Sequence, residues 1–167
     1  MKKFLTILII CFLLTGCSSN PLPASSTDAP QPNLTIGNPW RDYDSLEEAE
    51  ATSGLNFPLP EVIADSYTAE SFRVMNGELL EVIYLDGEYK VSVRMKAGEN
   101  QDISGVYGEF ENVRTFEADG AAVTEMHIDE GILQLISKDG YSYSLYAPNY
   151  YWGDSNVEFL QYIYDAK

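Results

Sequence analysis

The chain has 167 residues and many groups that could do acid–base chemistry, but their spacing forms no catalytic signature. A general base such as His127, the only histidine, would need a nucleophile and an orienting partner that the sequence does not identify. Neighbouring acids, such as Glu109 with Glu111 or Asp129 with Glu130, could supply the carboxylate pair of a glycosidase, but sequence does not fix their separation across a cleft. We therefore expect a structural histidine, solvated carboxylates and no catalytic residue.

An acidic group near the start of the predicted folded region could gather a hard cation. Asp42, Asp44, Glu47 and Glu48 offer the oxygen ligands that calcium takes, but the glycine and bidentate glutamate of the EF-hand spacing are missing. Asp44 fits better beside a helix N-terminus, where negative charge is favourable. We expect neither a metal nor another cofactor.

Cys17 carries the most specific chemistry in the sequence. It ends the tetrapeptide Leu14-Thr15-Gly16-Cys17, which follows two lysines and an apolar run at 4–14 that is too short to span a bilayer. This arrangement resembles the lipobox of bacterial lipoproteins, in which the cysteine is lipidated, for instance with palmitate, and becomes the first mature residue. The resemblance predicts a signal peptide at 1–16 and an extracytoplasmic protein held at the cell membrane by its lipid.

The charge of the chain limits its partners. Loss of Lys2 and Lys3 with the signal peptide would leave eight basic residues against 26 acidic ones, a formal net charge of −18. A domain this acidic repels nucleic acid and anionic surfaces, so we expect no nucleic acid partner and a purely covalent hold on the membrane. With Cys11 removed and Cys17 lipidated, no thiol remains for a disulfide or a thiolate site.

Composition divides the mature chain into a tether and a domain. Residues 17–38 are rich in proline, serine and other small polar residues, which cannot form a core and favour extended chain. Residues 39–167 are long enough to bury one hydrophobic core, so we expect a single domain there.

Capping signals place a helix at each end of this domain. Ser45 and Glu48 form a capping box, with Gly54 at the expected C-terminal stop. Ser155 and Glu158 form a second box that would start a closing amphipathic helix.

Between the two helices, alternating apolar and polar residues predict strands. The pairs Asp86-Gly87, Asp119-Gly120 and Asp139-Gly140 predict type I′ hairpins. The fold class is therefore α+β, with an antiparallel sheet of about six or seven strands and a helix at each end.

The loop positions also predict strand register. An Asp86-Gly87 loop pairs Tyr84 with Tyr89 and leaves Glu81 diagonal to Lys90 and Arg94, a solvated charge pattern. In the second hairpin, Arg114 pairs with Glu125, and His127 faces Asn112.

The hairpin predicted at Asp139-Gly140 has two apolar faces, although a sheet that is open to water on one side needs only one. One face is core, and the other carries Leu133, Leu135 and Tyr146. Either a helix or loop covers this second face, or an apolar ligand binds there. The nearby loop with Tyr150, Tyr151 and Trp152 either contacts a sugar or protein partner, or is pinned to the sheet by its tryptophan. These six residues form the candidate binding surface.

The folded region resembles a family of uncharacterised envelope domains of Gram-positive bacteria. The resemblance lies in the segments 45–49, 54–58 with Pro60, 80–84, 140–143 and the closing helix from Ser155. That family is distantly similar to lipoprotein carriers and periplasmic stress sensors, whose curved sheets bind acyl chains or lipoprotein segments. The resemblance implies a non-enzymatic module that binds a ligand or an envelope protein; the alternatives are an envelope hydrolase using paired carboxylates and a structural or assembly subunit.

Overall fold

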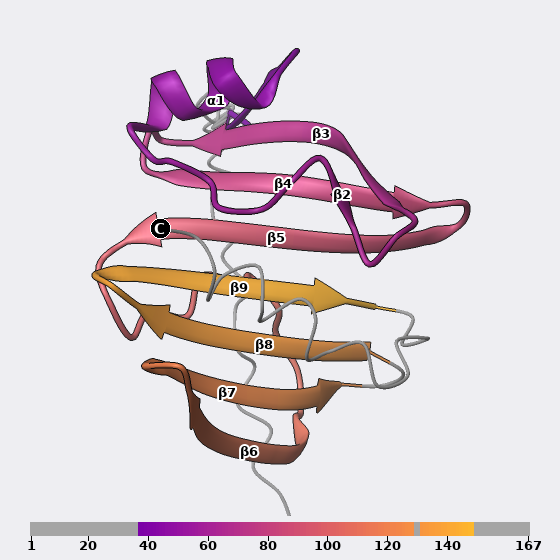
Figure 1. Ribbon diagram of the computed structural model, residues 1–167, viewed down its shortest axis with the longest axis vertical. Coiled ribbons are helices and arrows are strands. Elements are labelled where there is room, and N and C mark those ends of the chain that lie inside the picture. The colour runs from indigo at the N-terminus through magenta and orange to yellow at the C-terminus, as the bar shows by residue number, and fades with distance from the viewer. Residues whose placement is uncertain (1–36, 129–130, 149–167) are drawn as a thin grey trace, which may run out of the picture. The chain divides into compact units, whose positions relative to one another are not determined.

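A computed structural model describes residues 37–128 and 131–148, which form a sheet-dominated fold (Figure 1). The predicted signal peptide, the tether up to residue 36 and the predicted helix from Ser155 lie outside the described residues. The described part contains one antiparallel sheet of nine strands and one short helix.

The elements follow one another along the chain, and the longest connection between described elements spans residues 98–110. In order they are β1 Trp40–Tyr43, α1 Leu46–Ser53, β2 Val62–Ile63, β3 Tyr67–Met75, β4 Leu79–Asp86, β5 Tyr89–Ala97, β6 Glu111–Ala118, β7 Ala121–Ile128, β8 Gly131–Lys138 and β9 Tyr141–Ala147. Across the sheet the order is β1-β3-β4-β5-β9-β8-β7-β6, with β2 paired to β3.

This order joins two runs of neighbouring strands at the β5–β9 pair. After β5 the chain crosses the sheet through residues 98–110, forms the far edge as β6 and returns strand by strand to β9. Figure 1 shows this connection passing behind the sheet. We call residues 98–110 the crossing loop and the face of the sheet over which they pass the second face.

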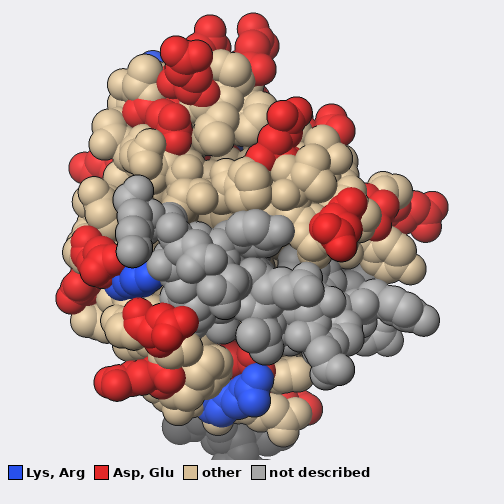
Figure 2. Space-filling model, viewed as in Figure 1, with Lys and Arg blue, Asp and Glu red and all other residues tan. Residues whose placement is uncertain are grey.

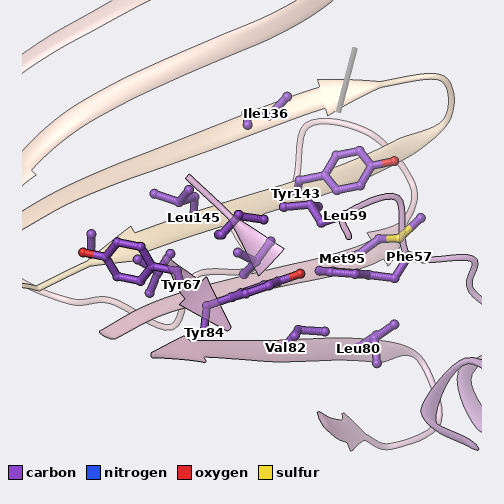
Figure 3. Packing of buried hydrophobic residues seen from close by; sticks show 14 of the residues in the cluster. Phe57, Leu59, Tyr67, Leu80, Val82, Tyr84, Met95, Ile136, Tyr143 and Leu145 are labelled. Atoms are coloured by element: carbon purple, nitrogen blue, oxygen red, sulfur yellow. The ribbon is translucent and has the colours of Figure 1, made fainter. Parts of the chain in front are cut away.

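The main core lies on the opposite face, which we call the first face. It is lined by alternate residues of each strand, including Leu80 and Val82 of β4, and is covered in part by the chain between α1 and β3 (Figure 3). From that chain Phe57, Leu59 and Ile63 are buried. Burial of these apolar side chains stabilises the described domain, residues 37–128 and 131–148, which contains no cysteine.

The helix α1 has the caps that the sequence indicated. The Ser45 hydroxyl accepts a hydrogen bond from the backbone N–H of Glu48 at 3.2 Å. Gly54 ends the helix with a φ of 69°, a conformation in which glycine has no Cβ penalty. Ala49 is fully buried and attaches the helix to the core.

Two short strands were missed by the sequence prediction. β1 has four residues and β2 has two, and neither is long enough to show an alternating pattern. The sheet therefore has nine strands rather than six or seven.

The predicted register of the β4–β5 hairpin is wrong by two residues. Asp86 pairs with Tyr89, so the loop is Gly87-Glu88 and Tyr84 pairs with Val91. Gly87 has a φ of 59° at the first loop position, where type II′ turns require glycine. A shift of two keeps every side chain on its predicted face but changes its neighbours across the strands.

The β6–β7 hairpin departs from prediction at one point. Arg114 pairs with Glu125, which confirms the predicted neighbours, but His127 faces Glu111 instead of Asn112. A bulge between Glu111 and Arg114, where Asn112 has a φ of 49°, accounts for the difference.

Candidate functional site

The second face of the sheet carries a row of polar side chains in direct register. Arg73 of β3 pairs with Glu81 of β4, which pairs with Arg94 of β5, and Arg94 pairs with Ser144 of β9. Side chains that are directly opposite on neighbouring strands lie within reach of each other. The row thus brings two arginines to one carboxylate.

Glu81 accepts four hydrogen bonds from three residues. Its Oε2 accepts from Arg73 Nε at 2.7 Å and also from Arg73 Nη2. Its Oε1 accepts from Arg94 Nε at 2.9 Å and from the Ser92 hydroxyl at 2.7 Å. Both oxygens are therefore saturated by charge-assisted bonds.

The prediction that Glu81 belongs to a solvated charge pattern is wrong. Its side chain is only 1% exposed. The two-residue register shift places Arg94 opposite it rather than diagonal to it. Trp40 and the crossing loop cover the cluster.

Trp40 of β1 stacks on both arginines. The guanidinium carbons of Arg73 and Arg94 lie 4.9 Å and 5.2 Å from the centroid of its ring. Cation–π attraction at these distances adds to the ion pairs. The first strand of the fold is in this way attached to the charged row.

The crossing loop closes over the other side of Arg94. Arg94 Nη1 donates to the Ile103 carbonyl at 3.1 Å and to the Ser104 carbonyl. At Gly105, where φ is 63°, an added Cβ would lie 2.6 Å from the same nitrogen. Only glycine allows the loop to approach the guanidinium so closely.

These hydrogen bonds decide the protonation of Glu81. Burial alone would raise the pKa of its carboxyl, but the hydrogen bonds from Ser92, Arg73 and Arg94 and the charge of Arg94 outweigh that effect and lower the pKa below its ordinary value. The cluster therefore contains two cations and one anion at neutral pH.

A cleft of about 210 Å³ opens beside this row, and we call it the second-face cleft. Its lining combines three cations, one carboxylate, three serines and one tyrosine with a short stretch of the crossing loop. The lining residues are Arg73, Glu81, Lys90, Ser92, Arg94, Ser104, Gly105, Val106, Ser144, Tyr146 and Pro148.

A second buried acid lies on the first face. Glu125 accepts from Arg114 Nε and from Gln134 Nε2, both at 2.7 Å, and its Oε1 lies 4.0 Å from His127 Nε2. Burial raises the pKa of Glu125, but the hydrogen bonds from Arg114 and Gln134 and the nearby charges lower it overall. This arrangement orients a carboxylate and offers no nucleophile among the described residues.

The residues predicted to form a binding surface do not share one pocket. Leu133 is fully buried, so it is part of the packing. Leu135 is half-buried and lines a different cavity of about 260 Å³ whose other residues include Asn100 and Thr124. Tyr146 lines the second-face cleft, while Tyr150, Tyr151 and Trp152 lie outside the described residues.

The crossing loop lies over this second face. It contacts Arg94 on β5 and approaches Ile128 on β7, where a Cβ on Gly108 would meet the isoleucine side chain at 2.6 Å. Of the two interpretations of the second apolar face, the described residues favour cover by a loop.

The other acidic residues considered from the sequence do not line the second-face cleft as far as the structure describes them. Glu109 and Glu111 are exposed on the β6 side, and Asp129 and Glu130 are not described. No group of three or more His, Cys, Asp or Glu in the described residues, Asp42 and Asp44 included, could hold a metal ion.

Sequence reasoning missed Arg73, Ser92 and Trp40 as members of one cluster. The signal that could have found the cluster was that Arg73, Glu81 and Arg94 lie on the same face of three neighbouring strands. With the observed β4–β5 register, Glu81 falls directly between the two arginines. Nothing in the local pattern indicated that Trp40 would stack on them, because that contact depends on a short strand at the sheet edge.

Comparison of the sequence and the fold with protein-family models, curated proteins and solved structures found no match. Across residues 37–128 and 131–148, no helix has the length and apolar character that a membrane crossing needs.

Proposed function

We propose that this protein is a membrane-anchored, extracytoplasmic lipoprotein whose sheet domain is a non-catalytic binding module, with its ligand site in the second-face cleft. The anchor is the lipid on Cys17 that the tetrapeptide Leu14 to Cys17 predicts. The residues that follow act as a tether between the lipid and the domain.

The fixed state of Glu81 is the observation that favours binding over catalysis. It is the only carboxylate among the described residues that line the second-face cleft. Two arginines and Ser92 saturate it and lower its pKa, so it neither accepts a proton near neutral pH nor reaches toward a substrate. A hydrolase using paired carboxylates would need two acids with pKa values pushed apart in one cleft.

The lining of the cleft favours a polar ligand. Arginine, lysine and serine side chains surround it, and its volume lies below the range of about 300–1,000 Å³ for pockets that hold drug-sized molecules. An acyl chain would find little apolar surface there.

The anchor is tested by mass spectrometry of the full chain after export from a Gram-positive host. We expect a mature N-terminus at Cys17 that carries a lipid, and membrane-bound protein on fractionation. Cys17→Ser should leave the protein unlipidated and move it out of the washed membrane fraction. An unmodified Cys17, or membrane binding that survives the substitution, would overturn the proposal.

The binding role is tested by native mass spectrometry of the same exported protein. Extra mass that denaturation releases, and that Lys90→Gln reduces, would support a ligand in the second-face cleft. Lys96→Gln is the matched control, because Lys96 is on the same strand and face but pairs with Glu78 at 3.1 Å and does not line that cleft.

A further inference from the structure

We propose that the second-face cleft binds a phosphate group in its doubly charged form, as a phosphomonoester or as inorganic phosphate. This inference rests on the proposed binding function and names the class of ligand. Three observations carry it: the local charge, the donors left without partners and the size of the cleft.

The cleft concentrates positive charge in a very acidic chain. Three of its described lining residues are basic and one is acidic, which gives these residues a local charge of +2 in a protein whose net charge is −16. The described residues hold only seven basic side chains: Arg41, Arg73, Lys90, Arg94, Lys96, Arg114 and Lys138. A phosphomonoester carries about −1.5 to −2 at neutral pH, so it matches the local charge better than a single carboxylate does.

Several donors at the cleft have no partner within the described residues. Lys90 makes no ion pair there, although acids outnumber bases more than twofold in the chain. Arg73 Nη1 and Arg94 Nη2 are the guanidinium nitrogens left over once Glu81 and the crossing loop are satisfied. Ser144 faces the cleft beside Arg94 and is 2% exposed, with no hydrogen bond from its hydroxyl to any described residue.

These donors suit phosphate in particular. Guanidinium and ammonium groups form the short, charge-assisted hydrogen bonds by which proteins hold phosphate oxygens. The arginines are already oriented by Glu81, Trp40 and the loop, so binding a ligand would cost little side-chain ordering.

The volume limits what the phosphate can be attached to. About 210 Å³ equals roughly seven waters at about 30 Å³ each, enough for a phosphate and a short substituent. The source could be a free phosphomonoester or the headgroup of phosphatidic acid, since both present the same group.

The test is isothermal titration of the full lipidated chain in neutral detergent at low salt. We expect inorganic phosphate to bind at one site and acetate, a monoanion, to bind more weakly. Lys90→Gln should weaken phosphate binding about tenfold or more, the effect of losing one hydrogen bond to a charged group. Lys96→Gln, on the same strand and face, should change it less than about twofold, because exposed charges outside the site are screened.

Equal losses of phosphate affinity in the two variants would show a general charge effect and would overturn the site. The site would also be overturned if phosphate did not bind, or if acetate bound as tightly as phosphate. Because Lys90 is exposed, its substitution should leave the thermal midpoint unchanged. Competition by phosphatidic acid added in mixed micelles with the same detergent would assign the source to the lipid headgroup, and its absence to a soluble ligand; both results support the phosphate site.

The same protein separates this inference from the proposed function. A released native ligand without phosphorus would overturn the phosphate site and leave the binding module standing. An unlipidated chain would overturn the membrane-anchored function whatever the titration gives.

Discussion

Glu81 is a buried charge whose stability depends on all its partners at once. Taking an ion pair out of water is costly, and the attraction between the charges repays that cost only when the remaining hydrogen-bonding groups are also satisfied. Here both carboxylate oxygens are bonded, and one arginine is bonded again by the crossing loop. Removing the carboxylate would leave two guanidinium groups facing each other.

We expect Glu81→Ala to lower the free energy of unfolding by about 3–5 kcal/mol, the cost of breaking a buried pair. Glu78→Ala is the matched control, since Glu78 pairs with Lys96 at 3.1 Å but its side chain is 67% exposed, and exposed pairs contribute about 0–1 kcal/mol. Urea denaturation followed by tryptophan fluorescence measures both. Similar losses in the two variants would show that the cluster is not a stabilising unit.

The lowered pKa of Glu81 also predicts how stability changes with pH. Its carboxyl titrates below its ordinary value of 4.5 in the folded protein, so the ionised form stabilises the fold above that pH. This stability is lost as the pH falls through the lower, folded pKa. The free energy of unfolding should therefore drop between about pH 4.5 and the acid range, and less steeply in Glu81→Gln. Urea midpoints measured from pH 7 down to pH 3 test this, and parallel curves for the two proteins would contradict it.

Among the elements, the strands were predictable and their exact neighbours were not. Seven strand regions follow from alternation and Asp-Gly turns, because one face of each strand must be buried. A loop at Asp86-Gly87 and one at Gly87-Glu88 satisfy that pattern equally well, since a shift of two changes no face. The sequence prediction therefore missed the charged cluster, although it placed Arg73, Glu81, Ser92 and Arg94 on strands.

The crossing loop was the other element that sequence could not place. Residues 98–110 contain turn-forming and polar residues, which indicate a loop but not its path. The path follows from the pairing of β5 with β9, which forces the chain to reach the far edge before it returns. The cover of Leu133 and its neighbours is thus a consequence of long-range strand order.

Gly87 provides a test of the observed conformation of the β4–β5 loop. Its φ is 59° and an added Cβ would meet nothing within 4 Å, so Gly87→Ala should cost only the backbone strain, about 1–2 kcal/mol. Gly37→Ala is the control, because its surroundings are equally open and its φ is not positive, so we expect almost no change. Thermal unfolding of the two variants measures the difference. An unaffected Gly87→Ala protein would mean that the loop does not hold this conformation.

On the scale of the whole molecule, acidity dominates the surface while positive charge is confined to a few places. Figure 2 shows acidic side chains spread over the described surface of the first face, with few basic ones. The ion pairs of Glu81 and Glu125 are buried or partly buried, and salt screens such pairs much less than exposed charges. Salt should consequently relieve the repulsion among exposed acids more than it weakens the internal pairs.

We therefore expect the thermal midpoint to rise by several degrees when NaCl is raised from about 10 mM to about 200 mM, where the screening length falls from about 30 Å to below 10 Å. A large net charge destabilises the compact state through self-repulsion. Replacing the exposed Glu109 and Glu117 by lysine should raise the midpoint at low salt and shrink the response to salt. A midpoint that falls with added salt would mean that attraction between exposed pairs outweighs repulsion, and the acidic surface would then be a source of stability.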